Sequence, residues 1–151
     1  MTSSGNRPTS SNPSNSIVET FERVELLHVA VADAFCELIA AAVEQRGVAK
    51  ISLSGGSTPK IVYQMLAERE LPWNQIHWFW GDERNVPADS DESNQKMVRE
   101  ALLSRVAVPE SNIHAVPVDV NDPGAAASQY EQTMRQLFGD ATFPCWDLAL
   151  L

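Results

Sequence analysis

The sequence predicts an α/β fold, an open and mostly parallel doubly wound sheet with flanking helices. Segments with the apolar pattern of strands alternate with segments that have the three- and four-residue spacing of helices, as in βαβ units. The strand expected at residues 76–80 is also apolar in both of its alternating sets. One face carries Ile76, Trp78 and Trp80, and the other carries Phe79. A strand that is buried on both sides suits a parallel sheet covered by helices.

The elements follow one another along the chain with short connections. We expect strands at residues 17–21, 49–54, 76–80, 112–118 and 145–151. We expect helices at residues 22–45, 59–68, 91–106 and 123–139. In the first helix the apolar residues recur at helical steps, at Val24, Leu27, Val31, Phe35, Leu38 and Ala42. Gly47 follows where a C-terminal cap belongs, so we expect this helix to end there and to bury one face.

The chain has 151 residues, which is enough for one ordinary domain. Residues 1–16 are rich in Ser, Asn and Pro and predict a disordered tail. Ligands of open α/β sheets bind beyond the carboxyl ends of the strands, and the last expected strand stops at such an end. We therefore expect residues 17–151 to be the N-terminal part of a single longer domain, truncated after that strand. The alternative is a complete small domain that ends on a strand.

Composition restricts the partners of the protein. The formal net charge is −9, which argues against nucleic acid or an anionic membrane as the main partner. No apolar run reaches the length of a membrane span, and no secretory signal begins the chain. Cys36 and Cys145 lie far apart without metal-ligand spacing and are expected to be buried, reduced thiols. No pair of histidines has the spacing of a metal site either. These features predict a cytoplasmic protein without a metal.

A glycine-rich turn joins the strand at 49–54 to the following helix. Gly55 and Gly56 allow the backbone to turn sharply and to approach a ligand closely. Ser57 and Thr58 add hydroxyls, and Thr58 stands where a helix N-cap is expected, directly before a proline. With the free N–H groups of the helix start, they would form an anion-binding cradle. The motif by itself fits an ordinary tight turn before a capped helix equally well. Lys60 could add charge near a bound phosphate, but the pattern favours a solvated helix residue.

The second chemical feature follows the buried strand at 76–80. Asp82, Glu83 and Arg84 come directly after the glycine that ends this strand. They are therefore expected at the edge of the sheet where ligands bind. An arginine there can bind a phosphate or stabilise an oxyanion, and Asp82 can orient a water or accept a proton. The alternative is a surface ion pair between Arg84 and one of the two acids.

The two motifs together resemble the 6-phosphogluconolactonase family. The resemblance is carried by "LSGGSTP" followed by "WGDERNVPADSDESN", and it extends from about Val18 to the C-terminus. It implies a Rossmann-like sheet shared with glucosamine-6-phosphate deaminases and ribose-5-phosphate isomerases. It also implies hydrolysis of 6-phospho-D-glucono-1,5-lactone to 6-phosphogluconate, a step of the oxidative pentose phosphate pathway, without a cofactor.

The resemblance also implies roles for individual residues. The residues that would line the pocket and contact the sugar phosphate are Gly55, Gly56, Ser57 and Thr58. Asp82 and Arg84 would flank the reacting centre, and Asn94 would help to shape the pocket.

One departure from the family pattern concerns the general base. Members of the family continue into a loop resembling "GxGxDGHTASLFP", whose histidine activates the water, and this loop lies beyond Leu151. We therefore expect the chain alone not to hydrolyse the lactone above the spontaneous rate. The alternatives are a non-catalytic sugar-phosphate-binding or fold fragment, and a deaminase or isomerase relative with Asp82 as the base. For each, the expected partner is a small sugar phosphate, and the chain is a monomer or self-associates weakly through an unpaired sheet edge.

Overall fold

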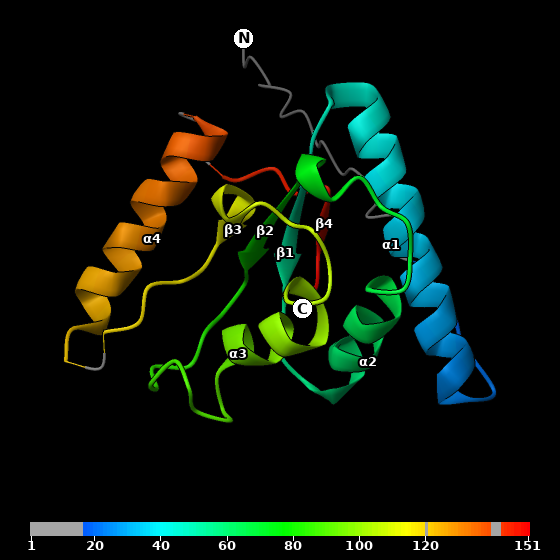
Figure 1. Cartoon of the computed structure of the whole chain (residues 1–151), viewed down its shortest axis with the longest axis horizontal. Helices are drawn as coiled ribbons and strands as arrows, with labels where there is room; N and C mark the ends of the chain where they lie inside the picture. Colours follow the sequence, from blue (N-terminus) through cyan, green and yellow to red (C-terminus); the bar gives the residue numbers. More distant parts are fainter. Residues whose placement is uncertain (1–16, 120, 140–142) are drawn as a thin grey trace, which may run out of the picture.

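A computed structural model describes residues 17–119, 121–139 and 143–151 of the chain (Figure 1). The tail expected at 1–16 lies outside the described residues. The helices are α1 (Val24–Arg46), α2 (Ser57–Leu66), α3 (Asn94–Val98) and α4 (Pro123–Phe138). The strands are β1 (Ala49–Leu53), β2 (Ile76–Trp80), β3 (Ile113–His114) and β4 (Leu148–Ala149). Short helical turns are η1 (Trp73–Gln75), η2 (Arg99–Leu103) and η3 (Glu110–Asn112), of which η2 is a π-helical turn that continues α3.

The four described strands form one parallel sheet in the order β3-β2-β1-β4. Strands β1 and β2 pair over their full length, from Ala49 opposite Ile76 to Leu53 opposite Trp80. The parallel, helix-flanked sheet confirms the predicted fold class. The order reverses at β1, which has β2 on one side and β4 on the other, as in doubly wound sheets.

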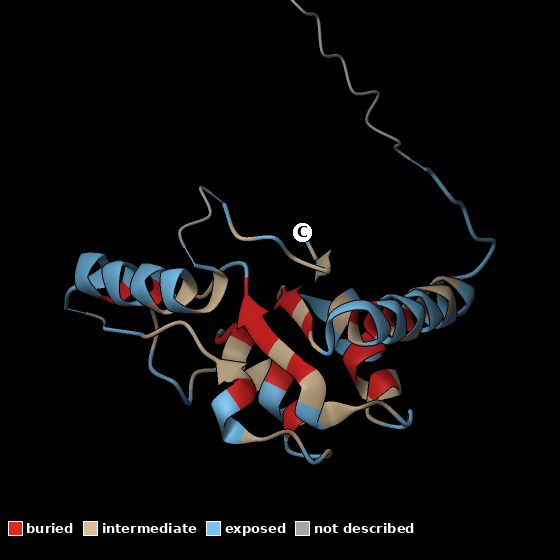
Figure 2. Ribbon diagram, turned by 90° about the horizontal axis from the view of Figure 1, so that it is seen from above, coloured by how far each residue is buried: buried red, intermediate tan, exposed pale blue. Residues whose placement is uncertain are grey.

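Helices lie on both faces of the sheet, as Figure 2 shows from above. On one face, Ile51, Leu53, Ile76 and Trp78 join the buried cluster formed with α1, α2 and η2. On the other face, Phe79 packs edge-on against Trp146 at 4.9 Å and against Phe138 of α4 at 5.4 Å between ring centroids. Strand β2 is thus buried on both faces, as its sequence predicts.

Helix α1 buries a set of residues that agrees only in part with the predicted one, sharing Phe35 and Ala42. Its buried side chains are Ala32, Phe35, Ile39 and Ala42. Val24 and Leu38, which were expected in the buried face, are about half exposed, at 53% and 42%. The helical spacing was correct, but most positions of this helix are apolar, so the composition did not single out the buried face. By length and composition α1 could cross a membrane, with a mean hydropathy of 1.9, a property that core helices share.

Several predicted elements are wrong or shorter than expected. Residues 17–21 form no strand, and Ile17 is 83% exposed, because this segment lies along α1 rather than beside a strand. The strands expected at 112–118 and 145–151 are reduced to two residues each. Strand β4 is partly exposed rather than buried, because it is paired only with β1 at the edge of the described sheet.

The two cysteines are also more exposed than predicted. Cys36 is half-buried on α1, and Cys145 is exposed in the segment before β4. Both are free thiols. Burial raises the pKa of the Cys36 thiol, which keeps it protonated and unreactive at neutral pH.

Two histidines from neighbouring strands meet on the α4 face of the sheet. The Nδ1 atom of His77 lies 2.9 Å from Nε2 of His114, and the two rings are nearly parallel. Sequence spacing did not reveal this pair, because the residues are 37 positions apart and only the strand pairing brings them together. Burial and, to a smaller extent, the charge of His77 together lower the pKa of His114 to about 4; burial and Lys50 lower the pKa of His77.

The histidine pair predicts a loss of stability in mild acid. Both folded-state pKa values lie below the ordinary value of 6.5, so the unfolded chain binds protons first as the pH falls. The free energy of unfolding should therefore be intact above pH 6.5 and fall between pH 6.5 and 4, by about 1–2 kcal/mol because the rings are partly solvated. Urea unfolding at pH 7.5 and 5 measures this fall. His114→Gln should flatten it and His28→Gln should not; an equal fall in both variants would contradict the assignment.

Candidate functional site

Two loops meet at the carboxyl edge of the sheet. Strand β1 ends at Leu53 and β2 ends at Trp80, and these two residues are paired. Because the strands are parallel, their following loops leave from the same edge, and Figure 1 shows α2 and α3 beginning there. The two sequence motifs are therefore adjacent in space.

The loop after β1 leads directly into α2. Gly56 has a φ of +111°, a conformation that residues with a side chain rarely adopt, and it is the residue that precedes the helix. Helix α2 begins at Ser57, so the predicted N-cap at Thr58 is wrong: Thr58 is an exposed residue of the first turn. Among the residues that the structure describes, no side chain caps this end of α2. The first N–H groups of the helix are therefore left for another acceptor.

Gly55 has a packing role that differs from that of Gly56. A Cβ at position 55 would lie 1.9 Å from Oδ1 of Asn94 and 2.6 Å from its Cγ. The Asn94 side chain is 7% exposed, and its Nδ2 donates to the backbone oxygen of Asp82 at 3.2 Å. Asn94 therefore joins the loop after β1 to the loop after β2.

Asp82 and Arg84 lie beside each other in the loop after β2. Nε of Arg84 is 3.6 Å from Oδ2 of Asp82, and both side chains are about 60% exposed. The exposed geometry makes this a weak ion pair, and it leaves the outer nitrogens of the guanidinium available to a ligand. The carboxylate of Glu83 instead accepts hydrogen bonds from backbone N–H groups, including those of Arg84 and Asn94.

The loops border an open surface cavity of about 300 Å³. Its lining residues are Gly56, Ser57, Lys60, Arg84, Asp91, Glu92, Ser93, Asn94 and Met97. Four of the predicted site residues are among them, Gly56, Ser57, Arg84 and Asn94. Gly55, Thr58 and Asp82 are not part of this lining, although Gly55 and Asp82 both contact Asn94.

Two cationic side chains, from different parts of the fold, line the cavity. Lys60 from α2 and Arg84 from the β2 loop both line it. The acid Asp91 is already paired with Lys96, at 2.7 Å, and this ammonium group holds the pKa of the Asp91 carboxyl below its usual value. Within the described part of the chain, Lys60 forms no ion pair. The geometry therefore favours a small anionic ligand, despite the negative charge of the whole chain.

Sequence reasoning missed several residues of this cavity. Lys60 was interpreted as a solvated helix residue, and the segment 91–93 was placed inside a helix. Instead, Ser93 is the N-cap of α3 and accepts from the N–H of Lys96 at 3.1 Å. The sequence did contain a signal for the beginning of α3, because serine is a preferred N-cap residue. The contacts of Glu83 had no local signal, since its partners lie ten to twelve residues ahead in the sequence.

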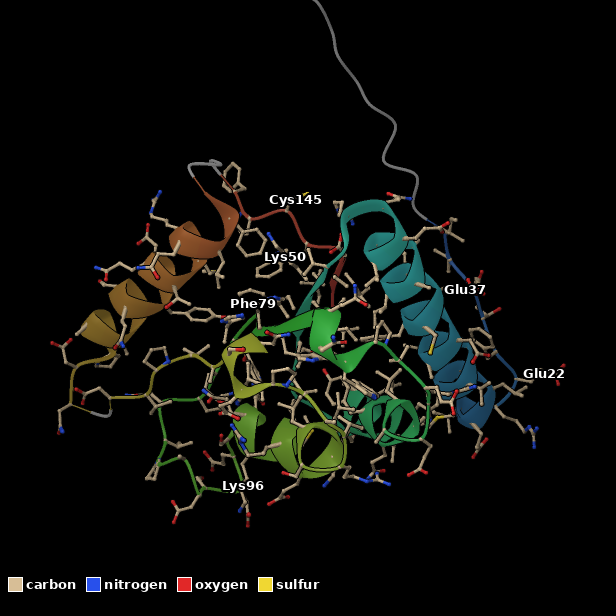
Figure 3. All side chains as sticks on the ribbon, turned by 45° about the horizontal axis from the view of Figure 1, so that its top comes forward. Glu22, Glu37, Lys50, Phe79, Lys96 and Cys145 are labelled. Atoms are coloured by element: carbon tan, nitrogen blue, oxygen red, sulfur yellow. The ribbon has the colours of Figure 1, made fainter. Side chains whose placement is uncertain are left out.

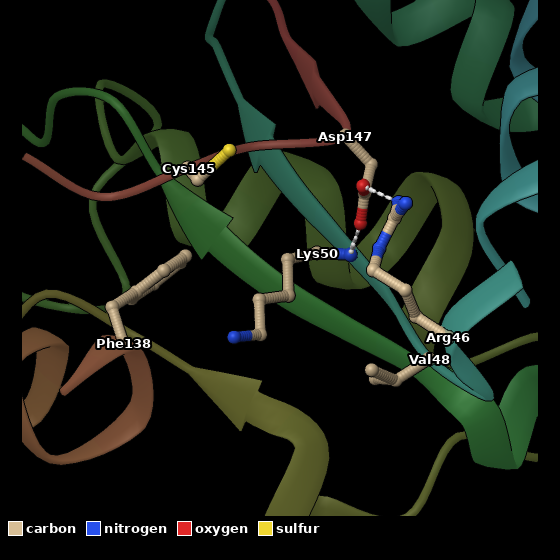
Figure 4. A pocket seen from close by; sticks show the side chains of 6 residues that line it. All are labelled: Arg46, Val48, Lys50, Phe138, Cys145 and Asp147. Atoms are coloured by element: carbon tan, nitrogen blue, oxygen red, sulfur yellow. Dashed lines mark hydrogen bonds and ion pairs between the residues drawn. The ribbon is translucent and has the colours of Figure 1, made fainter. Parts of the chain in front are cut away.

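A second hollow, of about 310 Å³, lies away from the predicted loops (Figure 4). Its lining residues are Arg46, Val48, Lys50, Phe138, Cys145 and Asp147. Its charges are already paired: Asp147 binds Arg46 and also accepts the backbone N–H of Lys50 at 2.7 Å. Nζ of Lys50 donates to the Leu137 oxygen at 3.1 Å and lies over the Phe138 ring. Figure 3 shows Lys50 and Cys145 on the side of the molecule opposite Lys96, so this hollow is not part of the candidate site. Its side chains connect α4 to the sheet, because Lys50 of β1 contacts Leu137 and Phe138 of α4.

Two tyrosines hold the strand ends that position the site. The hydroxyl of Tyr63 accepts from the N–H of Ser54 at 3.1 Å and donates to its oxygen at 2.8 Å. The hydroxyl of Tyr130 forms the same two bonds with Trp80, both at 3.0 Å. Burial raises the pKa of each tyrosine to about 12, so each phenol stays protonated and able to donate. Tyr130 replaces the pairing that β3 does not provide, since β3 ends at His114 opposite Phe79.

Removal of one of these hydroxyls should be measurable. Tyr130→Phe leaves the buried N–H and oxygen of Trp80 without partners, so we expect the free energy of unfolding to fall by about 1–2 kcal/mol. Urea unfolding measures the change, and hydrogen exchange of the Trp80 amide should accelerate. The matched control is Thr133→Val on the same helix, whose exposed hydroxyl bonds only within α4. Equal effects of the two changes would contradict this role of Tyr130.

The described residues contain no group of three or more metal-binding side chains. The cavity itself is lined by backbone groups, hydroxyls, two cations and the carboxylates of Asp91 and Glu92. Such a set can bind a phosphorylated polyol and stabilise negative charge that develops on an oxygen.

The family model and the sequence relatives that match this chain point to the same family. The family described as glucosamine-6-phosphate isomerases/6-phosphogluconolactonase matches residues 22–151. A 6-phosphogluconolactonase from Nostoc sp. is 49% identical over 112 residues, which are 73% of this chain and 47% of the relative. One from Thermotoga maritima is 41% identical over 110 residues, 72% of this chain and 47% of the relative. The chain thus spans about half the length of the curated relatives it matches.

Solved structures agree with the sequence relatives. The crystal structure of 6-phosphogluconolactonase from Thermotoga maritima superposes with a TM-score of 0.72 and 36% identity, covering 81% of this chain and 53% of the other. The 6-phosphogluconolactonase from Trypanosoma cruzi gives a TM-score of 0.75 at 33% identity, covering 85% and 55%. The similarity therefore includes the sheet and both loops of the candidate site.

Proposed function

Because the chain belongs to the family of glucosamine-6-phosphate isomerases and 6-phosphogluconolactonases, we propose that it provides the sugar-phosphate-binding loops of a 6-phosphogluconolactonase. The substrate is then 6-phospho-D-glucono-1,5-lactone and the product 6-phosphogluconate. The observation that carries the proposal is the convergence of Gly56, Ser57, Lys60 and Arg84 on one cavity at the carboxyl edge of the sheet. The names of the most similar relatives favour the lactonase over the isomerase branch of the family.

The proposed roles follow from the geometry. The first N–H groups of α2, with the Ser57 hydroxyl and Lys60, receive the phosphate, since a helix start favours negative charge. Arg84 donates to the substrate from the opposite loop and stabilises the charge on the lactone oxygen as water attacks. Asp82 orients the Arg84 guanidinium through their 3.6 Å contact. Thr58 contributes through its N–H at the helix start, and Gly55 and Asn94 shape the pocket.

Hydrolysis also needs a base that removes a proton from the attacking water. The three histidines of the chain do not line the cavity: His28 lies on α1, and His77 and His114 bind each other on the α4 face. The carboxylates of Asp82, Asp91 and Glu92 are all exposed, and the first two are paired with Arg84 and Lys96. We therefore propose that this chain binds and orients the substrate and that the water-activating group comes from outside its 151 residues.

A lactonase assay tests whether the chain binds the substrate without hydrolysing it. With the chain alone, we expect lactone hydrolysis at the spontaneous rate, because no histidine lines the cavity. Release of acid is followed in a pH-stat with increasing amounts of protein. A rate that rises with protein and disappears in Arg84→Ala would contradict the expectation and would show that the chain contains a complete active site.

A titration tests the binding proposal itself. We expect 6-phosphogluconate to shift the amide signals of Gly55, Gly56, Ser57 and Arg84 in a ¹⁵N-labelled chain. Gluconate, which lacks the phosphate, should bind at least tenfold more weakly, because the charge-assisted bonds are lost. Tighter binding of glucosamine 6-phosphate than of 6-phosphogluconate would instead favour the isomerase branch, and shifts confined to other residues would contradict the proposed site. A cytoplasmic location and a monomeric or weakly self-associating state stay predictions from the sequence.

A further inference from the structure

Glu83 makes an unusual set of contacts next to the candidate site. Its Oε1 accepts from the backbone N–H groups of Arg84 at 2.7 Å and Asn94 at 2.8 Å. Its Oε2 accepts from the N–H of Gln95 at 2.7 Å and from the Ser93 hydroxyl at 3.3 Å. A carboxylate has about four acceptor positions, so the side chain is fully occupied by protein donors. It is therefore available neither as an acid or base nor as an ion-pair partner of the neighbouring guanidinium.

These contacts join two segments that are distant in the sequence. Glu83 follows β2, whereas Asn94 and Gln95 form the first turn of α3. The carboxylate satisfies N–H groups that the start of a helix leaves without partners, and its negative charge suits that end of the helix. It thereby closes the loop 85–92, which provides Asp91 and Glu92 to the cavity.

The same turn of α3 carries the contact to the glycine loop. Asn94 is held by Glu83 through its backbone N–H, while its side chain donates to the Asp82 oxygen and fills the space beside Gly55. One carboxylate therefore determines where Arg84 leaves the β2 loop and where Asn94 meets Gly55.

We propose that Glu83 is the positioning residue of the sugar-phosphate pocket, which couples the Arg84 loop to the glycine loop through the first turn of α3. The inference rests on the proposed function, because it assigns Glu83 to the binding of the same ligand. This role needs the two acceptor oxygens of the Glu83 carboxylate. In Glu83→Gln, one of the two oxygens becomes an NH₂ group that faces at least one backbone N–H donor, so at least one of the contacts is lost.

The test compares the ¹⁵N-labelled chain with Glu83→Gln and with Glu100→Gln, a matched control on the exposed side of η2. Without ligand, Glu83→Gln should shift the amide signals of Gly55 and Gly56 as well as those of residues 93–95, and should leave α4 unchanged. A loss of stability alone would not produce this pattern. With 6-phosphogluconate, the Kd should rise about tenfold in Glu83→Gln and stay unchanged in Glu100→Gln.

The outcomes separate this role from the proposed function. Unchanged Gly55 and Gly56 signals together with unchanged affinity in a folded Glu83→Gln would overturn the positioning role and leave the proposed function intact. Absence of binding in the unaltered chain would overturn the proposed function, and the positioning role with it. If Glu83→Gln does not fold, Glu83→Asp replaces it, because the shorter side chain keeps the charge but cannot reach all four donors. It should then move the Gly55 signal in a folded protein and raise the Kd two- to threefold, and no movement of that signal would overturn the role.

Discussion

Replacing Gly55 with alanine is expected to lower the free energy of unfolding by about 3 kcal/mol and to abolish binding of 6-phosphogluconate. The new Cβ would lie 1.9 Å from Oδ1 of Asn94, far inside any real contact. The Asn94 amide is buried and bonded to Asp82, so it has little room to move. The backbone of Gly55 does not have a positive φ, so the effect comes from the clash and not from backbone strain. Urea unfolding and the 6-phosphogluconate titration measure the two effects.

Two further variants test the cause. Gly124→Ala is the control, because the added Cβ would lie no closer than 3.4 Å to Oδ1 of Asp122, at the start of α4. It should leave stability unchanged or raise it by up to about 1 kcal/mol, since alanine favours helix. In Gly55→Ala with Asn94→Ala, the clash is gone, so the double variant should lose less stability than the sum of the two single changes. Simple additivity would show that Gly55 does not act through Asn94.

Removal of the Arg84 guanidinium should weaken 6-phosphogluconate binding by about 30- to 100-fold, or roughly 2–3 kcal/mol. Arg84 faces the cavity opposite the start of α2, and its only ion pair among the described residues is the 3.6 Å contact with Asp82. The folded state should lose almost nothing, because that pair is exposed. Isothermal titration of Arg84→Ala with 6-phosphogluconate measures the loss.

The control for this prediction is Arg135→Ala on α4, which removes an exposed arginine paired with Glu131. It should bind like the unaltered chain. Arg84→Lys should recover only part of the affinity, because an ammonium group cannot form the paired, planar contacts of a guanidinium. Equal affinity of Arg84→Ala and the unaltered chain would show that Arg84 does not contact the ligand.

The main features of the fold could be predicted because they depend on local patterns. The bounds of β2 agree with the prediction, and α1 and α4 agree within two residues, since long helices and doubly buried strands have strong periodic signals. The strand predicted at 17–21 failed because an apolar run becomes a strand only where a neighbouring strand can pair with it. The lengths of β3 and β4 failed for the same reason, and in place of a longer β3 the Tyr130 hydroxyl pairs with Trp80.

The candidate site was predictable only in part. The glycine turn and the Asp82–Arg84 segment were found, because each follows a recognisable strand, and parallel strands end at the same edge. The separate roles of the individual residues within the site were not predictable. Gly55 is needed for its fit to Asn94, and Glu83 caps a helix that begins eleven positions later; both depend on tertiary contacts. Lys60 was undervalued because its significance comes from the opposite loop, where Arg84 lies.

A crystal structure of the chain with 6-phosphogluconate tests the location of the site most directly. The account predicts the phosphate at the start of α2, within hydrogen-bond distance of Ser57, and the carboxylate end of the ligand toward Arg84. Ligand bound instead in the hollow between Arg46 and Lys50, with the cavity at Gly56 and Arg84 unoccupied, would contradict it.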